Sequence, residues 1–237
     1  SDFHLGSPNL EESHNREKLI VSWLTSIEKD AKAIYLVGDI FDFWFEYKKV
    51  VPKGFVRVLG KIAELTDKGI AVHLFVGNHD LWMQDYLTEE IGVTIHHKPI
   101  VLEEQKKKLF IGHGDGLGSG DYFYKLLKQV FTSKVCQFLF ARLHPNFGLS
   151  LAHTWSRSSR KSSEAPFASK EKELLFRYCE KMQKTNPVDY YVFGHRHLPL
   201  ELKVDEKATY INLGEWILQN SYGVLKDGEL NLETYTK

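Results

Sequence analysis

The chain has 237 residues, and its 31 Lys and Arg residues balance its 31 Asp and Glu residues. A chain of this length buries a sizeable core and fits a single domain over residues 1–237. The zero net charge gives no reason to expect a nucleic-acid partner, because such proteins carry a basic excess.

Cysteine usage and hydropathy indicate where the protein works. Cys136 and Cys179 are far apart in a chain with eleven histidines, which favours reduced thiols in a cytoplasmic protein over a disulfide framework. No apolar run approaches the roughly 20 residues that span a bilayer, and no signal peptide begins the chain. Ser1 to His4 resemble the end of a strand, so we expect the natural chain to start further upstream.

Apolar periodicity predicts alternating helices and strands, which is typical of α/β proteins. The aromatic stretch Phe41 to Phe45 fits either packing against the next helix or an apolar wall beside a site. His96 and His97 are expected to be exposed turn residues, and Asp227-Gly228 a hairpin turn. Helices are predicted over residues 11–29, 56–67 and 170–183, and strands over 33–37, 72–76, 91–95, 100–102, 109–111, 188–193 and 208–213.

Residues 121–163 interrupt this alternation. The first part is strongly apolar with helical spacing, and residues 155–163 are basic and rich in hydroxyl groups. We interpret the stretch as a helical insertion that forms a lid. The plainer interpretation is a helical hairpin that packs on the domain and is followed by a flexible loop.

Side chains that bind metals or transfer protons follow five predicted strands, mostly directly after a glycine. Gly-Asn-His-Asp alone is a weak signal, because these are ordinary turn residues. Its repetition at other strand ends makes it strong, since the carboxyl edge of an α/β sheet is where sites are built. The residues are Asp2 and His4; Asp39; Asn78, His79 and Asp80; His113 and Asp115; and His195 and His197.

This set of side chains predicts a metal centre. Asp2 and His4, like His195 and His197, are two residues apart and would point the same way in an extended segment. Imidazole, carboxylate and amide groups together suit manganese, iron or zinc rather than calcium. The candidates exceed the needs of one ion, so two ions about 3.5 to 4 Å apart that share one carboxylate are the economical solution.

The ordered motifs Asp2-Phe3-His4, Gly38-Asp39, Gly77-Asn78-His79-Asp80, Gly112-His113-Gly114-Asp115 and Gly194-His195-Arg196-His197 resemble the calcineurin-like metallophosphoesterase superfamily across essentially the whole chain. The resemblance implies a four-layered α-β-β-α sandwich with a helical insertion. It also implies two divalent metal ions, with Mn²⁺ the expected metal, and a metal-bridging hydroxide as the nucleophile. One ion would take Asp2, His4, Asp39 and His197, and the other Asp39, Asn78, His113 and His195. His79 would lie near the phosphate as a catalytic residue, and Asp80 would orient its ring.

Finer features resemble the UDP-2,3-diacylglucosamine diphosphatase family of lipid A synthesis, among them residues 36–44, Asp121-Tyr122 and residues 210–216. This resemblance implies hydrolysis at the α-phosphate of that lipid-linked nucleotide, which gives UMP and 2,3-diacylglucosamine 1-phosphate. It also implies peripheral attachment to the cytoplasmic face of the inner membrane and a monomer or weak oligomer. An acyl-chain groove would be lined by Phe131, Val135, Phe138, Leu139 and Phe140. The substrate would be held by Asn78, His79, Asp121, Ser156, Arg157, Arg160, Lys161 and His195.

One position departs from this family. Well-known members have arginine where His79 stands, whereas histidine is the general choice of the superfamily. Another phosphodiester, pyrophosphate or phosphomonoester therefore stays open as the substrate. A catalytically inactive scaffold, and a lipid-binding protein of the membrane surface with structural metals, are the rival classes.

Overall fold

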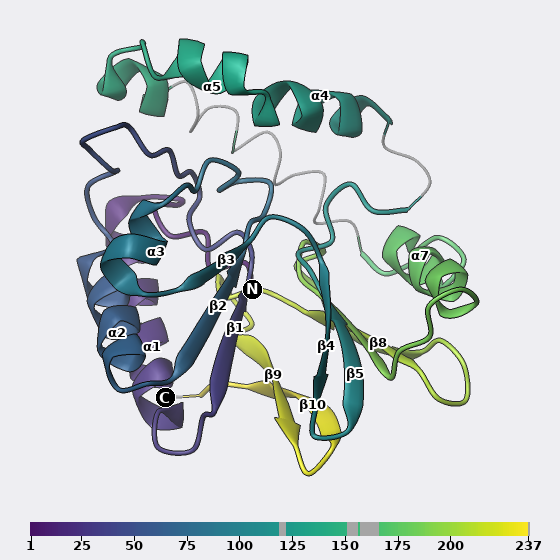
Figure 1. Ribbon diagram of the computed structural model, residues 1–237. Coiled ribbons are helices and arrows are strands. Elements are labelled where there is room, and N and C mark those ends of the chain that lie inside the picture. The colour runs from purple at the N-terminus through teal and green to yellow at the C-terminus, as the bar shows by residue number, and fades with distance from the viewer. Residues whose placement is uncertain (119–121, 151–155, 157–165, 237) are drawn as a thin grey trace.

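Two β-sheets are stacked face to face between layers of helices (Figure 1). The computed structural model describes residues 1–118, 122–150, 156 and 166–236. The first sheet is parallel and has the order β1 (Ala33–Val37), β2 (Ala71–Phe75) and β3 (Thr94–His96). Parallel neighbours need crossover connections, and these are α2 (Val56–Asp67) and α3 (Tyr86–Ile91), while α1 (Leu10–Ile27) precedes β1.

The second sheet is mixed and consists of β4 (Ile100–Glu104), β5 (Lys107–Ile111), β6 (Tyr190–Phe193), β7 (Pro199–Lys203) and β8 (Thr209–Leu213). Their order in the sheet is β4-β5-β6-β8-β7. Its strands β5, β6 and β8 run parallel to each other, and α7 (Leu174–Gln183) precedes β6. A hairpin of β9 (Ser221–Lys226) and β10 (Glu229–Thr234) turns at Asp227-Gly228, as predicted.

Alternation along the strands explains the layers, because successive side chains point to opposite faces of a sheet. In β1, Leu36 packs in the cluster shared with α1 and α2, whereas Val37 packs in the cluster between the two sheets. In β6, Val192 faces the other sheet and Phe193 packs in the cluster shared with α7. The four-layered α-β-β-α architecture expected from the sequence is confirmed.

Two local predictions were wrong, and one open alternative is resolved. Ile91 ends α3 and Gly92, at φ +78°, caps that helix, so the strand begins only at Thr94. His96 lies in β3 and its Nε2 is 3.1 Å from Nδ1 of His73, so it is not a turn residue. In the aromatic stretch, Phe41, Trp44 and Phe45 are buried, which supports the packing interpretation.

The insertion contains helices α4 (Tyr122–Thr132) and α5 (Lys134–Phe140). They lie together at one end of the two sheets, away from the outer helical layers (Figure 1). Residues 119–121, 151–155 and 157–165 are outside the described part of the chain, so the predicted lid boundaries at 121 and 163 stay a prediction. Within the described ranges, no helix combines the length and the apolar character that a membrane crossing requires.

Candidate metal centre

The first four residues lie beside the end of β1 and so join the site. The backbone N–H of Asp2 donates to Gly38 O at 3.0 Å, and that of His4 donates to Asp39 O at 3.0 Å. The loops after β1, β2, β5 and β6 meet there because β1 and β2 are parallel, as are β5 and β6. Side chains that are far apart in the sequence therefore converge at one edge of the sandwich.

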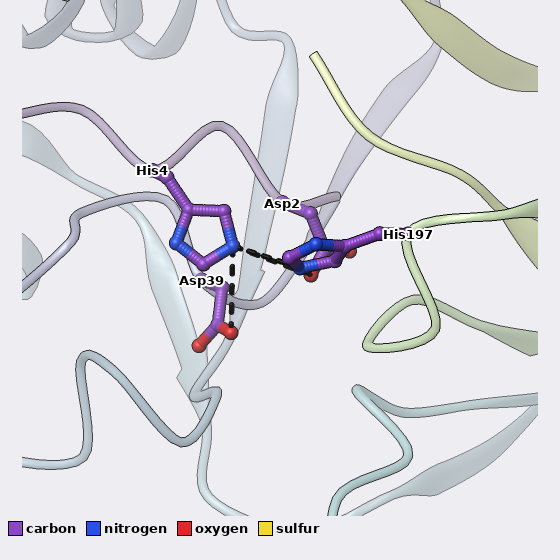
Figure 2. Close-up of side chains that lie close together, drawn as sticks. All are labelled: Asp2, His4, Asp39 and His197. Carbon is purple, nitrogen blue, oxygen red and sulfur yellow. Dashed lines mark hydrogen bonds and ion pairs between the residues drawn. The ribbon is translucent and has the colours of Figure 1, made fainter. Parts of the chain in front are cut away.

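One predicted set of ligands forms a tight cluster (Figure 2). Donor atoms of Asp2, His4, Asp39 and His197 all lie within 4.8 Å of one another. The Nε2 atoms of His4 and His197 are 2.9 Å apart, and His197 Nε2 is 3.2 Å from Asp2 Oδ1. Asp39 Oδ2 lies 3.9 Å from His4 Nε2. The cluster has the composition and size that a divalent metal ion requires.

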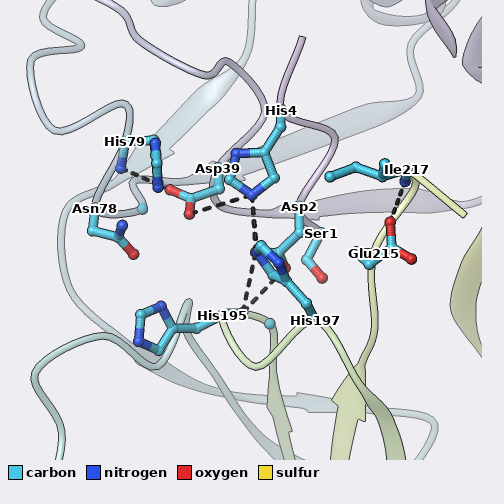
Figure 3. Close-up of polar contacts among 12 residues, drawn as sticks. Ser1, Asp2, His4, Asp39, Asn78, His79, His195, His197, Glu215 and Ile217 are labelled. Carbon is cyan, nitrogen blue, oxygen red and sulfur yellow. Dashed lines mark hydrogen bonds and ion pairs between the residues drawn. The ribbon is translucent and has the colours of Figure 1, made fainter. Parts of the chain in front are cut away.

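The second predicted set adjoins the first at Asp39. His113 Nε2 is 3.2 Å from Asp39 Oδ2 and 3.2 Å from Asn78 Oδ1. The His195 ring lies edge-on to that of His113, with 5.2 Å between centroids, and Figure 3 shows Asn78 and Asp39 in the same neighbourhood. One carboxylate, that of Asp39, therefore touches both sets, which is the position of a bridging ligand.

The residues fit a metal ion on physical grounds. His4 is fully buried, and its Nε2 faces the cluster, 2.9 Å from His197 Nε2 and 3.9 Å from Asp39 Oδ2. Asp2 and Asp39 are buried carboxylates whose hydrogen bonds and ion pairs, within the described part of the chain, are to imidazoles and backbone N–H groups. Buried polar groups without full partners are costly, and a cation bound between these donors would satisfy them.

Mutual charge shifts the titration of the cluster. Burial lowers the pKa of His113, but the Asp39 carboxylate outweighs burial and raises that pKa to about 10. Burial, together with the positive charge of His113, lowers the pKa of His195 to about 4. Burial opposes ionisation of Asp39, yet His113 and His79 hold its pKa well below the usual value. The centre thus keeps anionic oxygens in a buried place, which favours cations.

Backbone strain is concentrated at the same residues. In the described part of the chain, ten non-glycine residues have positive φ, and five of them are predicted ligands. Such conformations are rare outside glycine, and they persist where the surrounding structure enforces them, often at functional sites. The five are Asp2 (55°), His4 (44°), Asp39 (52°), His195 (69°) and His197 (50°).

Glycine at two strand ends allows the loops to approach each other. A Cβ atom at Gly77 would overlap the carboxylate and backbone N of Asp39, and one at Gly194 would overlap Asp2 and Ser1. Any larger residue would push the loop away from the ligand of a neighbouring strand. The recurrence of glycine before the ligands therefore has a packing cause as well as a conformational one.

His79 lies beside the first ligand set, and its ring centroid is 4.7 Å from that of His4. Its Nδ1 is 3.1 Å from Asp42 O, 2.9 Å from Ser156 Oγ and 3.9 Å from Asp42 Oδ1. The expected orienting residue, Asp80, instead accepts the backbone N–H groups of Gly77 at 2.7 Å and Ile40 at 2.8 Å. Asp80 therefore ties two loops together, and the backbone carbonyl of Asp42 and the hydroxyl of Ser156 are the hydrogen-bond partners of the His79 ring.

The predicted substrate contacts are only partly described. Ser156 is buried and touches His79, and Asn78 and His195 lie among the ligands. Asp121, Arg157, Arg160 and Lys161 lie outside the described residues, so their contacts with substrate stay predictions.

Two arginines brace the site, and sequence analysis missed both. Arg16 of α1 is buried and donates to the carbonyl oxygens of His4, at 2.8 Å, and Ser7. Arg196 Nε donates to both carboxylate oxygens of buried Glu173, at 3.1 Å each, and lies between two ligand histidines in sequence. The sequence could have pointed to Arg196, because it stands between His195 and His197. Arg16 looks like any charged residue of a surface helix, so nothing in the sequence singled it out.

Comparison with known proteins supports the geometry. A family model described as calcineurin-like phosphoesterase matches residues 1–199. The chain belongs to the calcineurin-like phosphoesterase family. It is a metal-dependent phosphohydrolase, and family membership implies divalent metal ions, for which Asp2, His4, Asp39 and His197 are candidate ligands.

Several curated relatives are named UDP-2,3-diacylglucosamine hydrolase. A UDP-2,3-diacylglucosamine hydrolase of Porphyromonas gingivalis is 39% identical and covers 99% of this chain and 95% of its own length. Another, from Aeromonas hydrophila, is 26% identical and covers 91% and 90%. Zinc-bound Vps29 from Entamoeba histolytica is a structural neighbour at 13% identity and a TM-score of 0.37, over 90% and 86% of the two chains, a likeness too weak to support a conclusion.

Proposed function

We propose that this hydrolase cleaves the phosphoanhydride of UDP-2,3-diacylglucosamine and releases UMP and 2,3-diacylglucosamine 1-phosphate. The observation that carries the proposal is the meeting of two ligand sets at Asp39, at the end of the sandwich where the helical insertion lies. The relative that is 39% identical over nearly the whole chain bears the name of this activity.

Two metal ions would bind at the centre, one to each ligand set, with Asp39 in common. When bound, they activate a water for attack on phosphorus and neutralise charge on the phosphate oxygens. Mn²⁺ suits the mixture of imidazole, carboxylate and amide donors, as do other first-row ions. The chain itself contributes a buried anionic cradle and fixes the positions of the donors through backbone bonds at Asp2 and His4.

His79 would act on the phosphate beside this cradle. Its described hydrogen-bond contacts are made by Nδ1, with Asp42 O and Ser156 Oγ. We propose that Nε2 faces a phosphate oxygen and moves a proton to the leaving group. An imidazole can hold or give a proton near neutral pH, whereas arginine cannot, so this position would work differently here than in relatives with arginine.

The insertion would bind the acyl chains. Val135, Phe138 and Leu139 are exposed, whereas Phe131 and Phe140 pack on the Trp82 ring at centroid distances of 5.9 and 4.7 Å. The predicted groove residues therefore divide into a packed base and an exposed rim. An exposed apolar rim of this kind marks a binding surface for apolar ligands.

The same segment suits an anionic membrane surface. Residues 122–150 contain four Lys or Arg residues and no Asp or Glu, in a chain of zero net charge. Apolar side chains combined with cations bind the headgroup region of anionic lipids. We propose peripheral attachment at the cytoplasmic face of the inner membrane, where a diacylated substrate would reside.

A second candidate is hydrolysis of a different phosphate ester at the same centre. It is favoured by His79, since histidine is the general choice of the superfamily. It differs from the first proposal in giving the insertion no acyl chain to bind.

The test is UMP release from UDP-2,3-diacylglucosamine with added Mn²⁺, measured beside p-nitrophenyl phosphate and bis-p-nitrophenyl phosphate. The proposal predicts fast turnover of the lipid nucleotide, lost on chelation and restored by Mn²⁺. Turnover of the generic esters alone would reject the substrate and favour the second candidate.

A further inference from the structure

Helix α4 carries one stripe of apolar residues outward. Tyr122, Leu126 and Val130 are 76%, 60% and 43% exposed, and their spacing of four places them on one face of the helix. A surface helix ordinarily packs such a stripe against the core. Burial of this stripe therefore does not hold α4 in place, and other contacts must do so.

The opposite face of α4 holds a carboxylate from the metal-centre loop. Asp115 is buried, and its Oδ2 accepts from Tyr124 OH at 2.5 Å and from Lys128 Nζ at 2.6 Å. Tyr124 and Lys128 are also four residues apart, so both reach the same point. Asp115 follows the predicted ligand His113 by two residues. The pair with Lys128 is partly buried, which strengthens it relative to an ion pair in water.

The other end of α4 is attached to a second ligand loop. Trp82 Nε1 donates to Phe131 O at 2.6 Å, and the Trp82 ring packs edge-on to that of Phe131. Trp82 follows the predicted ligand Asn78 by four residues. Asn78 and His113 themselves touch, with 3.2 Å between Oδ1 and Nε2. Helix α4 thus spans two loops that meet at the metal centre.

We propose that Asp115 is a positioning residue that clamps α4, through Tyr124 and Lys128, at a fixed place relative to the metal centre. The clamp holds the exposed apolar stripe at a set distance from the phosphate site and so favours substrates with an apolar group at that distance. The preference for an acylated substrate rests on the proposed function, whereas the clamp itself rests on the contacts of Asp115 and Trp82.

Hydrogen exchange of the α4 amides tests the clamp without activity. In metal-free protein, Asp115→Asn and Lys128→Met are each expected to speed exchange of residues 122–132 about tenfold, by freeing the helix to open locally. The double variant should exchange no faster than Asp115→Asn alone, since that change already removes the ion pair with Lys128. Lys128→Arg keeps the charge and should restore slow exchange. Lys181→Met, on the exposed face of α7, is the control for loss of one lysine charge.

Kinetics distinguish positioning from a general structural role. In Lys128→Met, KM for UDP-2,3-diacylglucosamine should rise about tenfold, while kcat for p-nitrophenyl phosphate changes less than about twofold. Unchanged hydrogen exchange of α4 in both single variants would overturn the clamp. Equal losses of activity on the lipid nucleotide and on p-nitrophenyl phosphate would also overturn it, because the change would then act on the metal centre through His113 and not on the position of α4. If the wild type hydrolyses only the generic esters, the proposed function fails while the exchange result still decides the clamp.

Discussion

The metal centre and the insertion are built on opposite principles. Asp2, His4 and Asp39 are at most 1% exposed, and backbone bonds or neighbouring side chains fix each of them. Leu126, Phe138 and Leu139 of the insertion are 57–60% exposed. The first region buries polar groups and the second exposes apolar ones. Each arrangement is unfavourable for the protein alone, and each is relieved by a ligand of matching chemistry, a cation in one case and an apolar group in the other.

The largest effect is expected at the shared carboxylate. Asp39→Asn removes one anionic oxygen from both ligand sets, so kcat should fall more than about a thousandfold while the fold is kept. Circular dichroism measures whether the fold is kept, and a metal titration measures whether metal binding is lost. Asp67→Asn, an exposed carboxylate at the end of α2, is the matched control. A folded Asp39→Asn protein with full activity would reject the bridge.

Adding a single methyl group at Gly77 should also weaken metal binding. In Gly77→Ala the added Cβ overlaps Asp39, and we expect metal affinity to fall about 10- to 100-fold, as for changes beside metal ligands. Isothermal titration with Mn²⁺ gives the affinity.

The matched substitution for this change is Gly60→Ala in α2, where no atom lies within 4 Å of the new Cβ. It should stabilise the fold by about 0.5–1 kcal/mol in urea unfolding, because alanine favours the helix interior. Equal metal affinities in the two variants would contradict the close packing of Gly77 on Asp39.

The exposed rim should matter for substrate and not for stability. Phe138→Ser removes an apolar side chain that is 57% exposed, so the free energy of unfolding should change by less than about 0.5 kcal/mol. KM for the acylated substrate should rise several-fold. A core change such as Leu36→Ala provides the contrast, with a loss of about 2–5 kcal/mol. A large loss of stability in Phe138→Ser would show that the insertion is ordinary core.

The smallest effect is expected at the histidine pair of β2 and β3, His73 and His96. Burial lowers the pKa of both His73 and His96, so the folded state binds fewer protons than the unfolded chain. Their neutral forms are compatible with the fold above about pH 6.5, and stability is lost as pH falls through that value. Both are substantially solvated, so His96→Gln should reduce the slope of stability between about pH 7 and 5 by only a few tenths of a kcal/mol per pH unit.

The sequence predicted more of the metal centre than of its surroundings. Asp39 and Asn78 were visible because a buried strand and a glycine precede each, and parallel strands bring such ends together. Arg16 and the pairing of Asp42 with His79 were not visible, because they depend on how α1 and the loop after β1 pack in three dimensions.

The insertion shows a different limit of sequence patterns. Apolar spacing correctly predicted helices there, but it cannot say which face turns inward. In α4 the face with Tyr124 and Lys128 is held on Asp115, and the apolar stripe is outside. Apolar residues lie on both faces of α4, since Phe131 packs on Trp82, so hydrophobic periodicity alone does not assign the inner face.

The most direct test compares kcat/KM for UDP-2,3-diacylglucosamine with that for the same nucleotide sugar lacking both acyl chains, with Mn²⁺ present. If the metal centre and the insertion act on one molecule, the acylated substrate should be preferred at least about a hundredfold, and Phe138→Ser should narrow the preference. Equal values for the two substrates would contradict the account, leaving a phosphohydrolase whose insertion has no part in substrate choice.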